Sequence, residues 1–225
     1  MKSYFFIFDS FAYINSILLI VYSILAFVVL KRNKNNIQRV IAFYLLASCF
    51  FDTLSRFFIT FFNEIVSDTG TFVFIRILFR VVELLIIGYL INKYWLKSTV
   101  VWYLIAGSSV YLLYDLCTYK ANGILNYEAN AQTVANLLLM ILIAVNLLKQ
   151  LRSNQTFTVT NQMLSMVFLA YFSIHLIYTV IQNFIINQSF SDKSFVLFYS
   201  SYVVLHIAYY FALAFILFKN LKKHN

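Results

Sequence analysis

Proline is absent from this 225-residue chain, and glycine, cysteine and acidic residues are scarce. The sequence holds 4 glycines, 2 cysteines and 8 Asp or Glu residues, against 17 Lys or Arg. Cys49 and Cys117 fall in separate apolar runs, so neither a disulfide framework nor a thiolate metal site is expected. Only 11% of the residues are charged and 62% are hydrophobic. A water-soluble domain could not hide so much apolar surface, so the composition indicates an integral membrane protein with the lipid bilayer as its partner.

Seven apolar runs are long enough for membrane-spanning helices, each of which needs about 20 residues. They cover Phe11–Leu30, Val40–Phe62, Phe72–Ile91, Thr99–Cys117, Ala129–Leu148, Met163–Ile186 and Phe195–Phe218. Backbone groups in lipid must bond internally, and the alternating pattern of a β-barrel is absent. We therefore predict an all-α, seven-transmembrane-helix bundle that forms a single domain over residues 1–225. The fifth run is the least regular, and Met1–Asp9 shows no cleavage site of a signal peptide.

The charged residues between these runs form two sets that alternate along the chain. One set has eleven basic residues and no acidic one: Lys31, Arg32, Lys34, Arg39, Lys93, Lys97, Lys149, Arg152, Lys219, Lys222 and Lys223. The other set has Lys2, Lys120 and Lys193 with Asp9, Glu64, Asp68, Asp115, Glu128 and Asp192. Basic connectors are retained on the cytoplasmic side. The pattern predicts an N-terminus outside and a C-terminus in the cytoplasm.

The net charge of +9 does not indicate nucleic-acid binding, because the basic residues form no compact patch with interleaved aromatic residues. The short basic connectors instead offer a surface for a cytoplasmic protein partner. The wealth of Phe, Tyr, Asn and Lys points to an AT-rich genome, and we expect a multi-pass protein of the bacterial inner (plasma) membrane.

An internal duplication is suggested by a shift of 123 residues, which lays the second and third runs over the sixth and seventh. Leu46-Ala47 then meets Leu169-Ala170, Phe72-Val73 meets Phe195-Val196, Asp52 falls on His175, and Glu83 on His206. The spacing fits a 3+1+3 plan with parallel repeat units 1–94 and 127–225 and a linker helix 99–117. The identities are few and apolar helices align easily, so a chance similarity is the alternative.

Three familiar seven-helix families do not fit the sequence. Retinal proteins need a lysine in the last span, where this chain has none and places His206 instead. Sugar transporters of the 3+1+3 type rely on helix prolines, and zinc hydrolases of lipid amides carry two histidines four residues apart in the last span. Both features are missing, so the sequence points to no family.

Five charged residues lie deep within the apolar runs, where a charge is expensive and each is a candidate for a functional site. The second run carries Asp52 and Arg56, and the third carries Arg76, Arg80 and Glu83. Their spacing places each set on one helix face. Counting about 1.5 Å per residue from the outer ends puts Asp52 level with Arg80 and Glu83. We predict that Asp52 contacts Arg80 or Arg56, and that Glu83 faces the same interior.

Polar stripes also follow the sixth and seventh runs. One face of the sixth carries Tyr171, His175, Tyr178 and Gln182, and one face of the seventh carries Tyr199, Tyr202, His206 and Tyr210. Three arginines against two carboxylates leave one positive charge, which an arginine cannot readily discharge. We therefore expect an anionic ligand or lipid headgroup in an outward-opening pocket with basic walls and an aromatic lining. The predicted ligand-binding residues are Asp52, Arg56, Arg76, Arg80, Glu83, Tyr171, His175, Tyr178, Tyr202 and His206.

A plainer interpretation is open for all of these residues. Buried charges often pair only to satisfy one another and to fix helix register, and tyrosines in bundles pack while bonding a neighbour. A subunit buried in a larger complex would show the same pattern.

Three functions are compatible with the sequence. A sensor or receptor-like protein that signals to a cytoplasmic partner is favoured by the short connectors and by the lack of a catalytic motif. A proton-coupled or small-solute carrier or channel is the alternative, because carboxylates and histidines at mid-depth are typical of proton relays. Carriers often contain broken helices, however, and the runs contain only Gly88 and Gly107 as glycines.

The third function is an intramembrane lipid-modifying enzyme with zinc held by Asp52, Glu83, His175 and His206. No local ligand motif supports this arrangement, and the neighbouring arginines would repel a metal ion. We therefore expect no catalytic residue, no metal and no cofactor.

Overall fold

The computed structural model describes the backbone of residues 2–32, 35–62, 70–118, 130–152, 158–186 and 192–221, and most of their side chains. Within these ranges the secondary structure is entirely helical, which confirms the predicted all-α class. The elements are α1 (Lys2–Arg32), α2 (Asn36–Phe62), α3 (Gly70–Leu90), a π-helical turn η1 (Ile91–Leu96), α4 (Thr99–Thr118), α5 (Asn130–Arg152), α6 (Val159–Ile186) and α7 (Asp192–Leu221).

Six of these helices, α1, α2, α4, α5, α6 and α7, are long and apolar enough to cross a membrane. They include α5, which corresponds to the least regular of the apolar runs and has a mean hydropathy of 2.0 over an 18-residue window within Asn130–Arg152. The remaining helix, α3, is 21 residues long and carries Arg76, Arg80 and Glu83. Three such charges would be costly in contact with lipid alone. They therefore need partners from the helices that surround α3.

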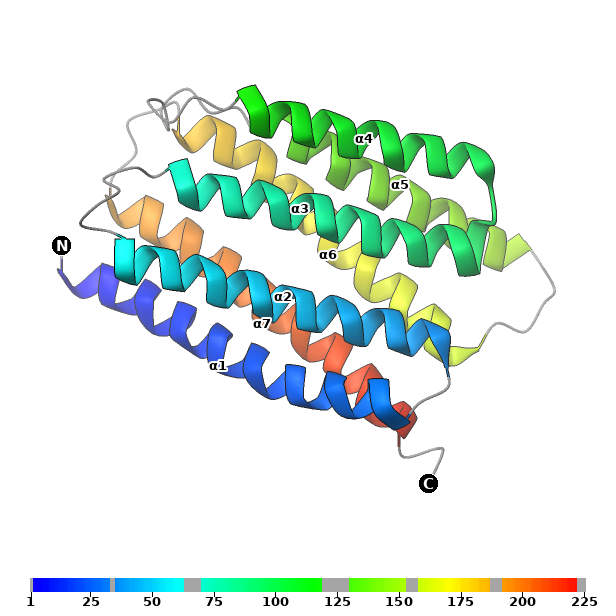
Figure 1. Ribbon diagram of the computed structural model, residues 1–225. Coiled ribbons are helices and arrows are strands. Elements are labelled where there is room, and N and C mark those ends of the chain that lie inside the picture. The colour runs from blue at the N-terminus through cyan, green and yellow to red at the C-terminus, as the bar shows by residue number, and fades with distance from the viewer. Residues whose placement is uncertain are drawn as a thin grey trace.

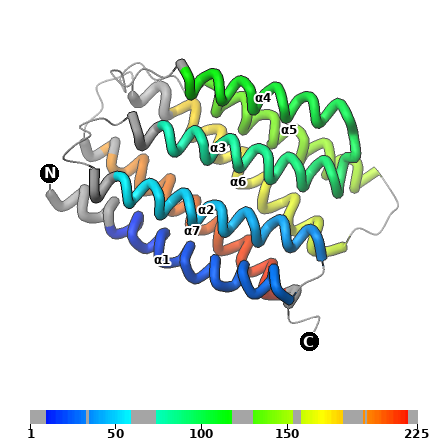
Figure 2. Tube along the Cα trace, viewed as in Figure 1, coloured from blue at the N-terminus to red at the C-terminus, as the bar shows by residue number. Residues whose placement is uncertain are grey.

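The helices lie side by side along one long axis and close into a ring in chain order (Figure 1). Each helix packs against the helices before and after it, and α7 packs against α1. Figure 2 follows the trace from α1 to α7 and shows these first and last helices next to each other. Further contacts join α3 to α5 and α2 to α7. Residues far apart in the sequence therefore meet inside the ring.

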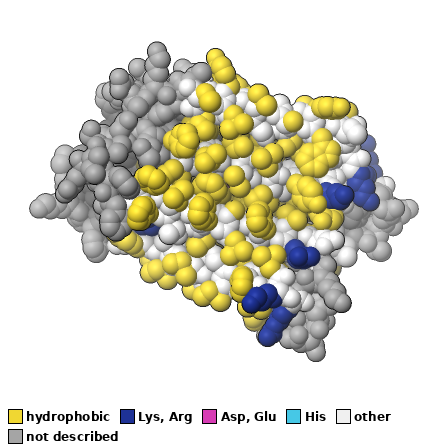
Figure 3. All heavy atoms as spheres, in the orientation of Figure 1, with side chains coloured by type: hydrophobic (Ala, Val, Ile, Leu, Met, Phe, Trp, Pro, Cys, Tyr) yellow, Lys and Arg dark blue, Asp and Glu magenta, His cyan; other side chains and the backbone are white. Residues whose placement is uncertain are grey.

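Exposed Lys and Arg side chains gather at one end of the bundle, which we call the basic end. It is formed where α1, η1, α5 and α7 finish and where α2, α4 and α6 begin (Figure 1). Its exposed basic side chains are Lys31, Arg32, Arg39, Lys93, Lys97, Lys149, Arg152 and Lys219. Figure 3 shows hydrophobic side chains over the middle of the visible face and Lys or Arg concentrated toward that end.

Most side chains of the second charge set are outside the part of the chain that the structure describes. They include the acidic residues Asp9, Glu64, Asp68, Glu128 and Asp192. Three residues of the basic set, Lys34, Lys222 and Lys223, are also not described. Asp115 is described and is half-buried near the end of α4.

The third apolar run stays helical beyond Ile91, where the sequence pattern placed its end. The π-helical turn η1 continues α3 to Leu96 and stops at Lys97, which has a φ of 54°. The backbone N–H of Lys97 donates to the Asn92 carbonyl oxygen at 2.7 Å, and the N–H of Ser98 donates to Asn92 Oδ1 at 2.8 Å. Asn92 thus accepts hydrogen bonds from two backbone N–H groups of the turn into α4. A hydropathy pattern cannot show such contacts.

α3 and α4 approach each other closely at Gly88. A Cβ atom at Gly88 would lie 2.8 Å from Ile105 Cδ1 and 3.0 Å from Ile105 Cγ1, whereas a Cβ at Gly107 would meet nothing within 4 Å. A side chain at position 88 must therefore displace Ile105 or part the two helices.

We expect Gly88→Leu to lower the free energy of unfolding by about 1–3 kcal/mol, because it overpacks the α3–α4 contact. Gly107→Leu is the matched control and should leave stability nearly unchanged. Thermal unfolding in detergent measures both. Adding Ile105→Ala to Gly88→Leu should recover part of the loss, and equal effects of the two leucines would contradict the close contact.

Candidate functional site

The interior of the bundle contains a buried ion pair within α3. The Arg80 guanidinium donates to Glu83 Oε2, and the two side chains are 5% and 2% exposed. The other carboxylate oxygen, Oε1, accepts a hydrogen bond from the Tyr44 hydroxyl of α2 at 2.6 Å. Glu83 is therefore satisfied on both oxygens, and it faces the interior as predicted.

Arg80 also connects α3 to α6 and α7. Its Nη2 lies 2.5 Å from His175 Nε2 and 2.8 Å from the Tyr202 hydroxyl oxygen. The Tyr202 hydroxyl is in turn 2.6 Å from His175 Nε2. Three polar side chains from three helices thus meet at one point.

The chemistry of the guanidinium fixes the proton positions around His175. A guanidinium can only donate, so His175 Nε2 is an acceptor and the ring proton lies on Nδ1. Nδ1 is 2.7 Å from the Asn136 side-chain amide of α5, whose oxygen and nitrogen are assigned from the hydrogen-bond pattern. With the proton on Nδ1, the amide presents its oxygen there.

We refer to Tyr44, Arg80, Glu83, Asn136, His175 and Tyr202 as the Arg80 network. These residues connect α2, α3, α5, α6 and α7, and Arg80, Glu83 and His175 are 5%, 1% and 0% exposed. Thr179 lies beside it, because its hydroxyl oxygen is 2.6 Å from the His175 carbonyl oxygen and 3.1 Å from the same amide atom of Asn136 that faces His175 Nδ1.

His206 lies beside the network with an equally defined proton arrangement. Its Nδ1 donates to the Tyr202 carbonyl oxygen at 2.9 Å, so Nε2 accepts from the Tyr171 hydroxyl at 3.0 Å. The Tyr171 ring stacks on Tyr209 at 3.7 Å between ring centroids. The rings of His175 and His206 are 5.8 Å apart, so the two histidines share one aromatic region as the stripes indicated.

Arg76 occupies the next turn of α3 toward its N-terminus and also contacts Tyr202. Its Nη2 lies 3.5 Å from the Tyr202 hydroxyl, and its guanidinium carbon is 5.6 Å from the centre of that ring. Tyr202 therefore lies between the guanidinium groups of Arg76 and Arg80.

Asp52 and Arg56 form a second ion pair, whose further hydrogen bonds run to α1. Arg56 Nε lies 3.2 Å from Asp52 Oδ2, so the predicted contact between Asp52 and Arg56 is confirmed. Asp52 also accepts from Ser16, and Arg56 donates to the Ala12 carbonyl oxygen. Both are about a quarter exposed, unlike the ion pair of α3. Asp52 and Glu83 were predicted to lie at the same depth, but they belong to separate clusters of side chains.

Tyr178 lies at the margin of the predicted set. Its hydroxyl donates to Ser201 at 2.6 Å, in an exposed position, while its ring is 5.3 Å from that of Tyr202. The side chain of Gln182, the last member of the stripe on α6, is outside the described residues.

Tyr44 and Asn136 belong to the network although neither was among the predicted residues. Asn136 is one of four buried amides on α5, with Gln132, Asn146 and Gln150. Their spacing of four, ten and four residues puts them on one helix face, which is the signal that could have indicated an inward-facing side. Tyr44 lies four residues before Ser48 and eight before Asp52, which places it on the same face of α2. This spacing does not indicate that Glu83 of α3 is its partner.

The proposed zinc ligands do not assemble around one point. Among the side chains that the structure describes, no three His, Cys, Asp or Glu are placed to share a metal ion. Glu83 is occupied by Tyr44 and Arg80, and Arg80 lies between Glu83 and His175. A cation there would be repelled by the guanidinium.

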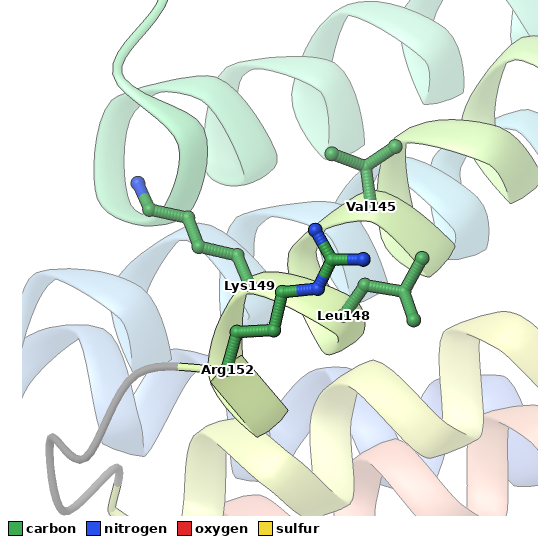
Figure 4. Close-up of a pocket in the computed structure, with 4 residues that line it drawn as sticks. All are labelled: Val145, Leu148, Lys149 and Arg152. Atoms are coloured by element: carbon green, nitrogen blue, oxygen red, sulfur yellow. The ribbon is translucent and has the colours of Figure 1, made fainter.

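A pocket of about 500 Å³ lies elsewhere, at the basic end of α5. It is lined by Val145, Leu148, Lys149 and Arg152 (Figure 4). This pocket is separate from the Arg80 network and was not indicated by the sequence.

We expect Glu83→Gln to destabilise the protein by about 3–5 kcal/mol, because it leaves the Arg80 charge buried without its carboxylate. Tyr44→Phe should cost about 1–3 kcal/mol, since only one buried hydrogen bond is lost. Denaturant or thermal unfolding in detergent gives both values, with Tyr103→Phe on the exposed face of α4 as the control. The pair Arg80→Met and Glu83→Leu should destabilise less than Glu83→Leu alone. A double variant worse than the single one would mean that the ion pair is not the main reason for burying these residues.

Comparisons with known proteins give this network no counterpart. No protein-family model, no curated protein and no solved structure matches the chain. The function is therefore inferred from the geometry of the network and from the basic end of the bundle.

Proposed function

We propose that this chain is a multi-pass membrane sensor or receptor-like protein that responds to an anionic ligand and signals to a cytoplasmic partner. The observation that carries the proposal is the shared contact of Arg80, His175 and Tyr202, which joins α3, α6 and α7. In this proposal the ligand approaches from the side of Arg76, and the helix shift is sensed at the basic end.

The shared contact has the properties of a switch. His175 Nε2 has one lone pair, while Arg80 and the Tyr202 hydroxyl both direct hydrogens at it. An anion that binds Arg76 and the Tyr202 hydroxyl would remove one of these donors. The remaining donor then keeps the histidine satisfied, so two discrete arrangements are available, as population shift requires. Helices packed in a ring convert such a change into small movements at their ends.

We also propose that α3 crosses the membrane with the six apolar helices, giving seven spans. Its charges support this placement, because Arg80 and Glu83 face the protein interior and each has partners there. The basic end would face the cytoplasm of a bacterial cell, since Lys and Arg dominate its connectors. Arg76 then lies toward the outside.

We further propose that residues 1–94 and 127–225 are parallel repeats around the linker helix 99–117. The helix contacts support a pseudo-twofold arrangement, because α1–α7 and α5–α3 contacts occur as an equivalent pair. The aligned residues behave alike as well. Asp52 bonds to α1 and His175 to α5, while Glu83 bonds to α2 and His206 to α6. An experimental structure in which the two units do not superpose by rotation about an axis near the membrane normal would contradict the duplication.

Single cysteines in a cysteine-free background should test the topology. We expect impermeant thiol reagents to label positions 68, 122 and 192 in intact cells, and positions 35, 153 and 225 only after the membrane is opened. The reason is the excess of Lys and Arg at the basic end. Labelling of position 225 from outside would refute the proposed number of spans.

A distance measurement between spin labels at Lys97→Cys and Lys219→Cys should test the switch, because both residues are exposed at the basic end. We expect Tyr202→Phe to change the ratio of two distance populations by about 5-fold, since one hydrogen bond is worth about 1 kcal/mol. Inorganic phosphate, compared with chloride at equal ionic strength, should shift the same ratio in the wild type. Arg76→Gln should abolish the phosphate effect while the protein remains folded.

The control for these measurements is Tyr103→Phe, whose side chain is 78% exposed on α4. Unchanged distances in folded Tyr202→Phe and no response to any of the conditions would mean that the network only stabilises the bundle. Proton uptake by liposomes that contain the wild type, abolished by Glu83→Gln, would replace the sensor with a carrier.

A further inference from the structure

The pocket at the basic end of α5 combines charge and apolar surface on one helix face. Its lining residues Val145, Leu148, Lys149 and Arg152 are spaced by three, one and three residues, so they cover neighbouring turns. Figure 4 shows the Arg152 guanidinium folded back over the side of Leu148 and Val145, with Lys149 reaching to the other side of the helix. The pocket has a volume of about 500 Å³ and is open at the surface of the bundle.

The apolar part of this pocket is open. Val145 and Leu148 are 46% and 53% exposed, and Lys149 and Arg152 are exposed as well. The two cations and Val145 lie at different heights along α5. The two cations belong to the last turn of α5, and Val145 lies about one turn deeper in the membrane-spanning part of the helix. The polar half of the pocket therefore belongs at the membrane surface and the apolar half among acyl chains.

Two further lysines lie at a turn that neighbours α5. The turn η1 packs against α5, and the exposed Lys93 and Lys97 lie in and directly after η1. None of the described residues that line the pocket is a carboxylate that would oppose an anion. Lys and Arg in a last turn also interact with the dipole of their own helix, but that interaction needs no apolar pocket beneath them.

We propose that this pocket binds an anionic phospholipid. Its phosphate is held by Arg152 and, once its exposed side chain turns toward Arg152, by Lys149, and one acyl chain lies against Val145 and Leu148. Basic pockets at the membrane surface are suited to such headgroups. The occupant is a lipid and not a free anion, because a free anion would leave the apolar half of the pocket unused. This site is independent of the Arg80 network and of the sensor function, and it requires only that the basic end lies in a headgroup layer.

The test compares the purified wild type with Lys149→Gln/Arg152→Gln in phosphatidylcholine nanodiscs that contain increasing phosphatidylglycerol. Bound phosphatidylglycerol is counted by native mass spectrometry, and thermal stability is recorded in parallel. We expect the double variant to lose about 30-fold in apparent affinity, which corresponds to about 1 kcal/mol for each of the two cations. Stability in pure phosphatidylcholine should stay close to that of the wild type, because both residues are exposed.

The matched control is Lys31→Gln/Arg32→Gln, which removes the same charge from the last turn of α1 at the same end. It should retain phosphatidylglycerol binding. An equal loss in both double variants would show diffuse surface attraction and overturn the proposal. Stabilisation of the wild type in phosphatidylcholine by inorganic phosphate, equal to that by phosphatidylglycerol and lost in Lys149→Gln/Arg152→Gln, would also overturn it. Leu148→Asn gives a further arm, because it should weaken binding of phosphatidylglycerol with the charges intact.

Discussion

Arg80 brings a permanent positive charge into the interior of an apolar bundle, where its side chain is 5% exposed. A guanidinium does not lose its proton under these conditions, so the surrounding helices must supply acceptors. Glu83 supplies one from the same helix, while His175 and Tyr202 supply others from α6 and α7. These polar contacts thus link α3 to α6 and α7, whereas its main packing partners are α2, α4 and α5. Tyr44 and Asn136 extend this constraint to α2 and α5 as partners of Glu83 and His175.

Such a network does not make the bundle more stable than an apolar core would. Removing charges from water is costly, and replacing a buried ion pair by apolar residues is often neutral or stabilising. The network has a different property. Most of its donors and acceptors have a specific partner, although Arg80 Nε has none among the described residues. Loss of one partner leaves another group unsatisfied. An arrangement with few alternatives is specific. In the proposed switch, the shared acceptor His175 Nε2 allows a limited second arrangement, and this possibility supports the proposed sensor function over structural support alone.

The sequence predicted the helical class well because hydropathy and run length report directly on lipid exposure. It placed Glu83 in the interior and paired Asp52 with Arg56 because i, i+4 spacing constrains neighbours within one helix. It did not separate the Asp52–Arg56 pair from the Arg80 network. The depth of a residue can be estimated by counting residues along its helix. The direction in which its side chain points also depends on the rotation of the helix about its axis, which is set by packing against neighbouring helices. Asn136 was missed for a related reason, since a single amide in an apolar run attracts attention only when its whole helix face is considered. The π-helical turn at Asn92 and the pocket at Lys149 depend on local backbone and side-chain geometry that no periodic pattern contains.

The two proposed sites share one element. Asn136 contacts His175 in the second turn of α5, and Lys149 and Arg152 lie in its last turn. The 12 residues between Asn136 and Lys149 contain no glycine or proline, so this part of α5 is an unbroken helix of about 20 Å. Between the sites, Asn146 donates to Ser165 of α6 at 3.0 Å, which holds α5 and α6 together. A lipid that fixes the end of α5 therefore restrains the helix that positions Asn136, and through it His175. If both sites bind as proposed, thermodynamic linkage makes any coupling between them mutual. Its size is set by how differently the two arrangements of His175 position the end of α5.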